Sequence, residues 1–295
     1  MGSHRRRFIA ILVPLLLGAS PSLAARIVVF GDSWGVPAAP ALQQVLIDHG
    51  LADTVAGAAV GGDTAANLSS PSGLQFVTDT LAANPDADLV HLSIGGNDFL
   101  GSWSANMPPQ QEAGLFDAIL ADVETIVDHV LALRPDAKIL WSSYDYPRPL
   151  PLGTPAEVNA ASARFAPLAS ALAGAVGAGL SYGDFSGLMQ LSFGFDGVQY
   201  TAFDPPFPIP PGDPSLPDPN LPSPNAAYAD SIHLTAAGYA ILAEAQFDSF
   251  YAARLAPRGG PAVPALRRPL QALLAGLLLV AGAMERRHAS SSARS

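Results

Sequence analysis

The sequence predicts an α/β domain with a central parallel sheet of about five strands and helices on both faces. Short apolar, β-rich runs alternate along the chain with longer segments of helical periodicity. Glycine-rich polar turns follow the first three of these runs, as expected where strands end at one edge of a sheet. Apolar residues make up 49% of the 295 residues, which is enough to cover both faces of such a sheet.

The strands are expected at the apolar runs. In chain order these are 26–30, 54–56, 88–94, 137–142 and a weaker fifth run near 180–182. The flavodoxin-like strand order 2-1-3-4-5 is the simplest arrangement for five such strands, giving three layers. In a sheet of this kind ligands bind at the carboxyl ends of the strands, so the residues after each strand are the candidates for function.

The helices are expected between these strands. The predicted helices are 37–49, 72–83, 112–133, 155–176 and 235–253. The clearest is 112–133, whose apolar residues recur at the spacing of one buried helical face. Gly50 ends the first helix, and the pattern Ser72-Gly73-Leu74-Gln75 predicts a capping box at the start of the second.

One internal segment interrupts this alternation. Residues 205–224 contain ten prolines, and proline fixes φ and has no N–H to donate. We therefore expect an extended loop. Two interpretations stay open: a rim or lid beside the site, since the segment ends just before Asp230, or a surface insertion without a role.

The N-terminal residues 1–24 have the layout of a secretory signal peptide. Three arginines precede the apolar run 8–17, and the small residues Ser22 and Ala24 stand where a signal peptidase requires them. An apolar run of ten residues is too short to span a bilayer. We expect export to the periplasm, the outer surface or the medium.

The C-terminal residues 257–295 are predicted to lie outside the folded domain, which we assign to 25–256. They contain a linker, a short apolar segment at 270–284, and a tail rich in arginine and serine. This layout resembles the C-terminal sorting tails of some Gram-negative exported proteins. The apolar segment could bring the chain into contact with a membrane.

Composition excludes several classes of function. Residues 25–254 carry 24 acidic residues against six basic ones, so a nucleic acid would be repelled. The chain has no cysteine, which excludes disulfides, thiolate metal sites and a cysteine nucleophile. No nucleotide-binding glycine motif follows the first strand, and no paired histidines suggest a metal hydrolase. We expect no cofactor.

Three polar turns carry the candidate chemistry. The turns are GDSW at 31–34, GGDT at 61–64 and GGND at 95–98. In the order 2-1-3 their strands are neighbours, so Ser33, Gly62 and Asn97 meet at one edge. A hydroxyl, a glycine amide and a carboxamide are what acyl transfer by a serine requires, because the nucleophile needs hydrogen-bond donors for the oxyanion that develops.

A serine nucleophile also needs a base, and elimination leaves His233. The other histidines lie in terminal segments, in a strand or on helices: His4, His49, His91, His129 and His288. Asp230 precedes His233 by three residues, close enough to reach the imidazole and fix its tautomer. Asp145, after the fourth strand, is a rival for this role, and we favour Asp230 because its spacing is local.

These blocks together resemble the SGNH hydrolases of the GDSL family, in order and spacing, across residues 26–234. The resemblance implies that Ser33 is the nucleophile, His233 the general base, and Asp230 the acid that orients it. It also implies an oxyanion hole made of the Ser33 and Gly62 amides and the Asn97 side chain. Trp34 departs from the family, which usually has leucine after the serine.

The sequence thus predicts a secreted serine esterase or lipase that acts on a small-molecule or lipid ester through an acyl-enzyme. A carbohydrate O-acetyl esterase would use the same residues and stays open as an alternative. A non-catalytic, flavodoxin-like binding module is the alternative of another class. It would most simply lack the serine, the histidine or an oxyanion donor, and this chain has all of them.

Overall fold

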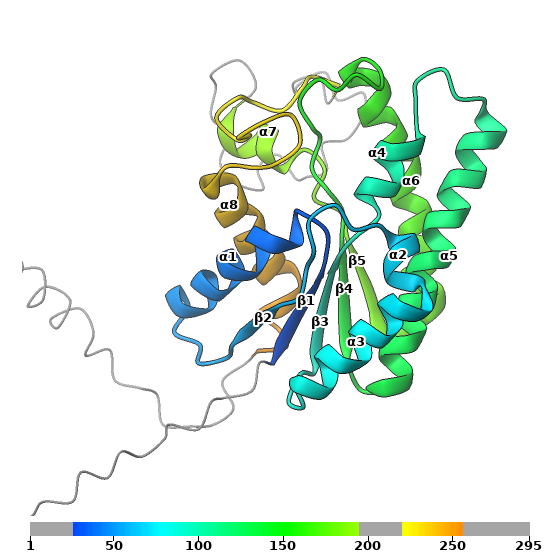
Figure 1. The fold of residues 1–295 in the computed structure, drawn as a ribbon. Coiled ribbons are helices and arrows are strands. Elements are labelled where there is room, and N and C mark those ends of the chain that lie inside the picture. The colour runs from blue at the N-terminus through cyan, green and yellow to red at the C-terminus, as the bar shows by residue number, and fades with distance from the viewer. Residues whose placement is uncertain (1–25, 195–219, 256–295) are drawn as a thin grey trace, which may run out of the picture. The chain divides into compact units, whose positions relative to one another are not determined.

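A computed structural model describes residues 26–194 and 220–255 of the protein, and Figure 1 shows their fold. Five parallel strands form one sheet in the order β2-β1-β3-β4-β5, which confirms the predicted order. The strands are β1 (Ile27–Gly31), β2 (Val55–Gly57), β3 (Leu89–Ser93), β4 (Lys138–Ser142) and β5 (Leu180–Gly183). Every strand lies within about one residue of its predicted place, since short apolar runs between glycine-rich turns leave little freedom in the assignment.

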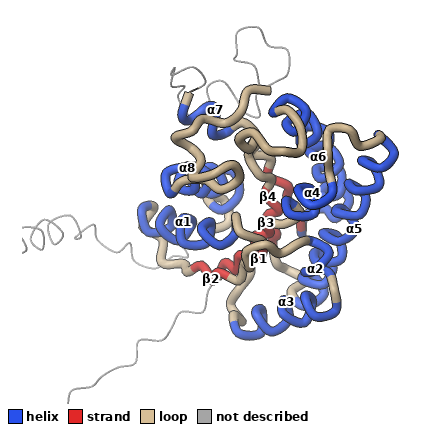
Figure 2. The backbone as a smooth tube through the Cα atoms, turned by 45° about the horizontal axis from the view of Figure 1, so that its top comes forward, coloured by secondary structure: helices blue, strands red, loops and turns tan. Residues whose placement is uncertain are grey.

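Helices cover both faces of this sheet (Figures 1 and 2). The helices α1 and α8 pack together over one face, and α3, α5 and α6 cover the other. The helices are α1 (Gly35–Asp48), α2 (Ala65–Ser69), α3 (Pro71–Ala83), α4 (Gly96–Ser102), α5 (Pro109–Leu133), α6 (Pro155–Val176), α7 (Leu188–Phe193) and α8 (Ala236–Gln246). A short 3-10 turn, η1 (Gly177–Gly179), precedes β5, and a π-helical turn, η2 (Phe247–Tyr251), follows α8.

The main core lies between the sheet and α3, α5 and α6. Phe30, Leu92 and Trp141 are register partners on three neighbouring strands, and all three are buried. Val123 and Ile126 of α5 pack into the same cluster, on the face that the periodicity of 112–133 predicts. Burial of each such side chain contributes about 1.5–3 kcal/mol, so this face fixes how α5 lies on the sheet.

The structure corrects the predicted start of the second long helix. The cap of α3 is Ser70, whose Oγ accepts a hydrogen bond from the Gly73 N–H at 3.2 Å. The capping box predicted at Ser72 is therefore wrong, because Pro71 takes the first helical position and places Ser72 inside the helix. The helix predicted for 235–253 also ends early, at Gln246, where the π-helical turn begins.

Three short helices, α2, α4 and α7, have no counterpart among the predicted elements. Each has seven residues or fewer, which is too short to display a helical period. The helix α2 begins directly after the turn that carries Gly62, and α4 begins within the turn that carries Asn97. The carboxyl edge of the sheet is therefore more helical than the sequence indicates.

Several predicted segments lie outside the described residues. These are the signal peptide at 1–24, most of the proline-rich segment, and the C-terminal segment at 257–295. Residues 220–224, the end of the proline-rich segment, are described, and the Leu221 carbonyl accepts hydrogen bonds from Asn159 of α6 and Gln190 of α7. Among the described helices, none is both long and apolar enough to cross a bilayer.

Candidate active site

The turn after β1 holds Ser33 at the carboxyl edge of the sheet. Gly31 has a φ of +149°, and a Cβ there would lie 2.1 Å from the Ser93 carbonyl oxygen, so only glycine fits. The Asp32 carboxylate is buried and accepts hydrogen bonds from the Trp34 N–H at 2.9 Å and from the Tyr144 hydroxyl. Burial raises the pKa of Asp32 to about 6, although the Tyr144 bond opposes the rise. Asp32 therefore fixes the turn on which Ser33 stands.

Ser33, His233 and Asp230 form a chain of hydrogen bonds. The Nε2 atom of His233 lies 2.8 Å from the Ser33 Oγ, and its Nδ1 atom lies 2.8 Å from Oδ2 of Asp230. The bond between His233 and Ser33 joins residues that are 200 positions apart in the sequence. The arrangement is the one that a serine nucleophile, a base and an orienting acid require.

The loop before α8 positions the acid and the base. Oδ1 of Asp230 accepts the N–H groups of Ile232 and His233, each at 2.7 Å. The N–H of His233 is the main reason that the pKa of Asp230 falls to about 2, and the imidazole lowers it further. Thr235 then caps α8 by accepting the Gly238 N–H. Hydrogen bonds from the backbone of residues 232 and 233 thus hold the Asp230 carboxylate beside His233.

The other two turns are bonded to each other. Asn97 lies at the start of α4, and its Nδ2 donates to the Asp63 carbonyl at 2.8 Å. The next residue, Asp98, accepts the Ala65 N–H at 2.8 Å at the start of α2. Gly62 is exposed and has a φ of +81°, a conformation that favours glycine. The structure therefore brings Asn97 to the turn that carries Gly62.

Asp145, the rival for the orienting role, lies elsewhere. It is buried, and its two oxygens accept three backbone N–H groups at 2.6 Å, from Tyr146, Gly187 and Met189. Burial raises the pKa of Asp145 to about 7, against these three bonds. Its oxygens are bonded to its own loop and to the start of α7, and it is Asp230 that contacts His233.

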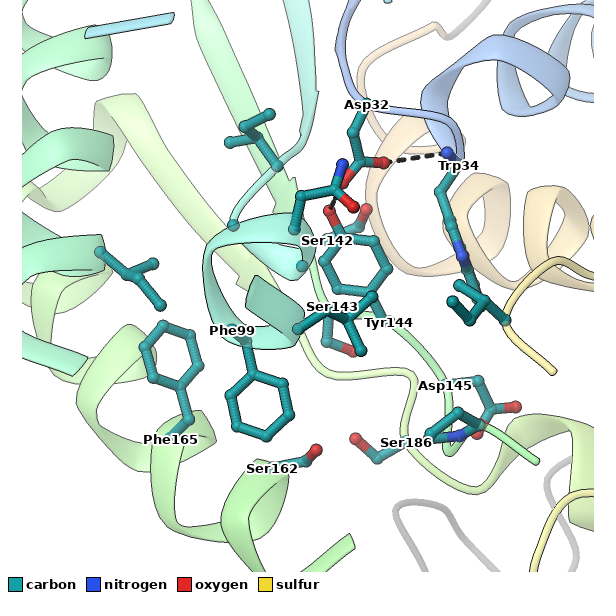
Figure 3. Close-up of a pocket in the computed structure, with 18 of the residues that line it drawn as sticks. Asp32, Trp34, Phe99, Ser142, Ser143, Tyr144, Asp145, Ser162, Phe165 and Ser186 are labelled. Atoms are coloured by element: carbon teal, nitrogen blue, oxygen red, sulfur yellow. Dashed lines mark hydrogen bonds between the residues drawn. The ribbon is translucent and has the colours of Figure 1, made fainter. Parts of the chain in front are cut away.

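A cavity opens beside Ser33, and Figure 3 shows many of its residues. Its lining comes from the turns after β1 and β3, from α4, α5 and α6, and from the segment after β4. Tyr144 is part of this lining, with its hydroxyl bonded to Asp32 and its ring centroid 5.2 Å from that of Trp34 (Figure 3). No pattern in the sequence predicts this cavity, because its lining is assembled from distant segments. Within the described residues, no cluster of His, Asp or Glu could hold a metal ion.

Comparison with known proteins agrees with this architecture. A family model described as the GDSL-like Lipase/Acylhydrolase family matches residues 26–241. A solved structure of a putative platelet activating factor from Streptococcus pneumonia is 16% identical, with a TM-score of 0.50, and the match covers 78% of this chain and 86% of that one. At this identity the likeness shows the fold alone.

Two further solved structures are similar. TesA is 22% identical, with a TM-score of 0.48 and coverage of 76% of this chain and 96% of that chain. Est24, a carbohydrate acetylesterase from Sinorhizobium meliloti, is 18% identical, with a TM-score of 0.47 and coverage of 78% and 99%. No curated protein sequence matches this chain.

Proposed function

This chain belongs to the GDSL-like lipase/acylhydrolase family and is a carboxylic ester hydrolase, and we propose that it is an exported serine esterase with a Ser33–His233–Asp230 triad. The family match bears out the resemblance that the turns suggest. The observation that carries the triad is the unbroken chain of hydrogen bonds from Ser33 through His233 to Asp230, with both bonds at 2.8 Å. Each step of the reaction can be assigned to one of these groups.

In the first step, the Ser33 Oγ attacks the ester carbonyl carbon while its proton passes to Nε2 of His233. Asp230 accepts the hydrogen bond from Nδ1–H, which leaves Nε2 free to act as the base. Because the pKa of Asp230 is held near 2, the carboxylate stays charged and stabilises the imidazolium that forms. The general base contributes about 10²–10⁴-fold to reactions of this kind.

The carbonyl oxygen gains negative charge in this step and needs donors. We assign them to the N–H groups of Ser33 and Gly62 and to the Asn97 carboxamide. The Asn97 Nδ2 carries two hydrogens, and only one is needed for its bond to the Asp63 carbonyl. The second hydrogen of Nδ2 is not needed for that bond, which supports a role for Asn97 in the oxyanion hole. The bond from Asn97 to Asp63 also keeps the Gly62 turn close to Asn97.

In the next step the tetrahedral adduct collapses, and the C–O bond to the alcohol breaks. The alcohol takes the proton from Nε2 of His233 and leaves. Water then attacks the acyl-enzyme, with His233 accepting its proton, and the Ser33 ester breaks to release the acid. The cycle restores the serine hydroxyl and the neutral imidazole.

Replacement of the nucleophile tests this proposal. Ser33→Ala should lower kcat for p-nitrophenyl butyrate by at least about 10³-fold, because within residues 26–194 and 220–255 no other hydroxyl is bonded to the His233 ring. A fluorophosphonate probe should label the wild type at Ser33, as read by peptide mass spectrometry, and should not label the variant. Ser142→Ala is the matched control, since Ser142 is bonded to a different histidine, the buried His91. Equal rates for Ser33→Ala and the wild type would refute the triad.

Export rests on the sequence of the N-terminus and has its own test. The arginines before the apolar run 8–17 and the small residues at Ser22 and Ala24 support cleavage after Ala24. The intact mass of the protein recovered outside the cytoplasm should then correspond to a chain that begins at Ala25. A chain that keeps residues 1–24 would contradict the proposal.

A further inference from the structure

We propose that the cavity beside Ser33 binds the acyl chain of the substrate, so that this enzyme prefers esters of uncharged acyl chains longer than acetyl. The inference rests on Ser33 as the nucleophile proposed above, and it names the substrate class that this nucleophile serves. Three observations carry it: where the cavity lies, what chemistry its lining offers, and which side of the triad it occupies.

The cavity leads from the nucleophile into the apolar interior. Ser33 and Asn97 line it at the carboxyl edge of the sheet. The lining continues to Ile119 of α5, Trp141 of β4 and Val158 of α6, each of which is 2–3% exposed. Figure 3 shows Phe99 and Phe165 along one side of this space. A chain attached at Ser33 can therefore bury its apolar length here.

The lining suits a group without charge. No lysine, arginine or histidine belongs to it in the part of the chain that the structure describes. Its two carboxylates are already bonded: Asp32 accepts the Trp34 N–H and the Tyr144 hydroxyl, and Asp145 accepts three backbone N–H groups. A phosphate or a second carboxylate would find no cation here, and burying it would be costly.

The lining offers few free hydrogen bonds to a sugar. The Ser162 hydroxyl donates to the Val158 carbonyl in its own helix. The Ser143 Oγ accepts the Phe185 N–H at 2.6 Å and donates to Asp184. A carbohydrate has several hydroxyls to satisfy, so it would lose hydrogen bonds on entering this space.

The position of His233 decides which part of the ester enters. The acyl carbon must lie between Ser33 and the oxyanion donors, and both Ser33 and Asn97 line the cavity. The alcohol must lie beside His233, which protonates it on departure. The His233 side chain is 39% exposed and lies outside the cavity lining. The alcohol thus leaves toward solvent, and the acyl chain points the opposite way, into the cavity.

A series of p-nitrophenyl esters tests the inference on the full chain. From acetate through butyrate to hexanoate, kcat/KM should rise about fourfold for each added methylene that the cavity buries. Lengthening the alcohol instead, from ethyl to hexyl acetate, should change kcat/KM by less than about threefold, because the alcohol side faces solvent.

A cavity-filling variant locates the effect. Ser162→Leu adds apolar bulk to the α6 side of the cavity, and it should lower kcat/KM for hexanoate by about tenfold or more while acetate changes less than about threefold. The matched control is Ser170→Leu, the same substitution at an exposed position of the same helix. It should leave the profile of the wild type unchanged.

The possible outcomes separate this inference from the proposed function. If wild-type activity depends on Ser33 but acetate or acetylated sugars are the best substrates, the acyl-chain inference is wrong and the triad stands. If Ser33→Ala keeps full activity, the triad itself fails. Should Ser162→Leu not fold, as read by its melting curve, product inhibition of the wild type decides: hexanoate should inhibit at least about tenfold more strongly than acetate. Equal inhibition by the two acids would overturn the inference.

Discussion

Two hydrogen-bonded serine–histidine pairs lie in the described part of the chain, and their hydrogen bonds are nearly the same length. The Nε2 atom of His233 is 2.8 Å from the Ser33 Oγ, and that of His91 is 2.9 Å from the Ser142 Oγ. The first pair stands on two loops at the carboxyl edge of the sheet. The second lies between the neighbouring strands β3 and β4 and is buried. A serine–histidine contact alone therefore does not define a catalytic site.

Charge and solvent distinguish the two pairs. Asp230 is bonded to His233, and it stays ionised because its pKa is held near 2. Burial alone lowers the pKa of His91 to about 4, so its imidazole stays neutral and is a weak base. The Ser33–His233 pair is the exposed pair, since the His233 side chain is 39% exposed. It can take up a proton during a reaction because the Asp230 carboxylate stabilises the imidazolium that forms. The Ser142–His91 pair, the buried pair, joins two strands, and no described carboxylate is bonded to its imidazole to stabilise a positive charge.

The largest effect should come from neutralising the acid of the exposed pair. Asp230→Asn should lower kcat for p-nitrophenyl butyrate by about 10³-fold, because the amide no longer stabilises the imidazolium or selects its tautomer. The Asp230 side chain is 57% exposed, so the free energy of unfolding should hardly change. Steady-state kinetics and urea denaturation measure the two effects. Loss of stability without loss of kcat would remove the distinction between the two pairs.

The buried pair should reveal itself through the pH dependence of stability. The pKa of His91 in the folded protein, about 4, lies below its ordinary value of 6.5. Between these two pH values His91 binds a proton in the unfolded chain but not in the folded protein. The free energy of unfolding that is present above pH 6.5 is therefore partly lost as the pH falls toward 4. The loss should reach about 3 kcal/mol by pH 4.

His91→Gln isolates this contribution, since glutamine can still bond to Ser142 but does not titrate. Relative to this variant, the wild type should lose free energy of unfolding between pH 6.5 and 4, as measured by urea denaturation at several pH values. Above pH 7 the difference between the two proteins should be constant. Parallel curves over the whole range would show that His91 titrates in the folded state as it does in the unfolded chain.

The third comparison is between the two aspartates. Asp145→Asn should lower the free energy of unfolding by about 2 kcal/mol, because an amide offers one oxygen where backbone N–H groups approach both carboxylate oxygens. Since Asp145 has no bond to His233, kcat for the folded fraction should fall by less than about threefold. This is the reverse of Asp230→Asn. A loss of kcat comparable to that of Asp230→Asn would return Asp145 to the orienting role.

The same contrast explains which features the sequence could predict. The strands and the pairing of Asp230 with His233 could be predicted from the sequence, because each depends on residues close in the chain. The hydrogen bonds of Asp145 could not, because its partners Gly187 and Met189 are the cap and the second residue of a six-residue helix that is too short to show a helical period. The α3 cap was misassigned because serines precede and follow Pro71, and only the backbone shows which one accepts the bond.

The cavity beside Ser33 was beyond prediction for a different reason. Many elements contribute residues to its lining, and neither the spacing nor the composition of these residues in the sequence indicates that they meet. Tyr144 is the clearest case. Nothing in its sequence surroundings indicates that its hydroxyl reaches Asp32, 112 positions earlier in the chain. Contacts of this range depend on the packed fold.

The smallest predicted effect concerns this Tyr144–Asp32 bond, which helps to hold the turn that carries Ser33. Tyr144→Phe keeps the ring that packs against Trp34 but removes the hydroxyl that Asp32 accepts. The bond from the Trp34 N–H to Asp32 remains and still holds the turn, so kcat should fall by less than about tenfold and stability by about 1 kcal/mol.

The pH dependence of that loss separates this bond from simple packing. The hydroxyl favours the charged form of Asp32, whose pKa is about 6, so its removal should destabilise the protein above pH 6 more than at pH 5. Urea denaturation of both proteins at pH 5 and pH 8 measures the difference. An equal loss at both values would mean that Tyr144 acts through its ring alone. A larger loss at pH 8 would show that the Tyr144 hydroxyl stabilises the charged Asp32 carboxylate, which holds the turn that carries Ser33.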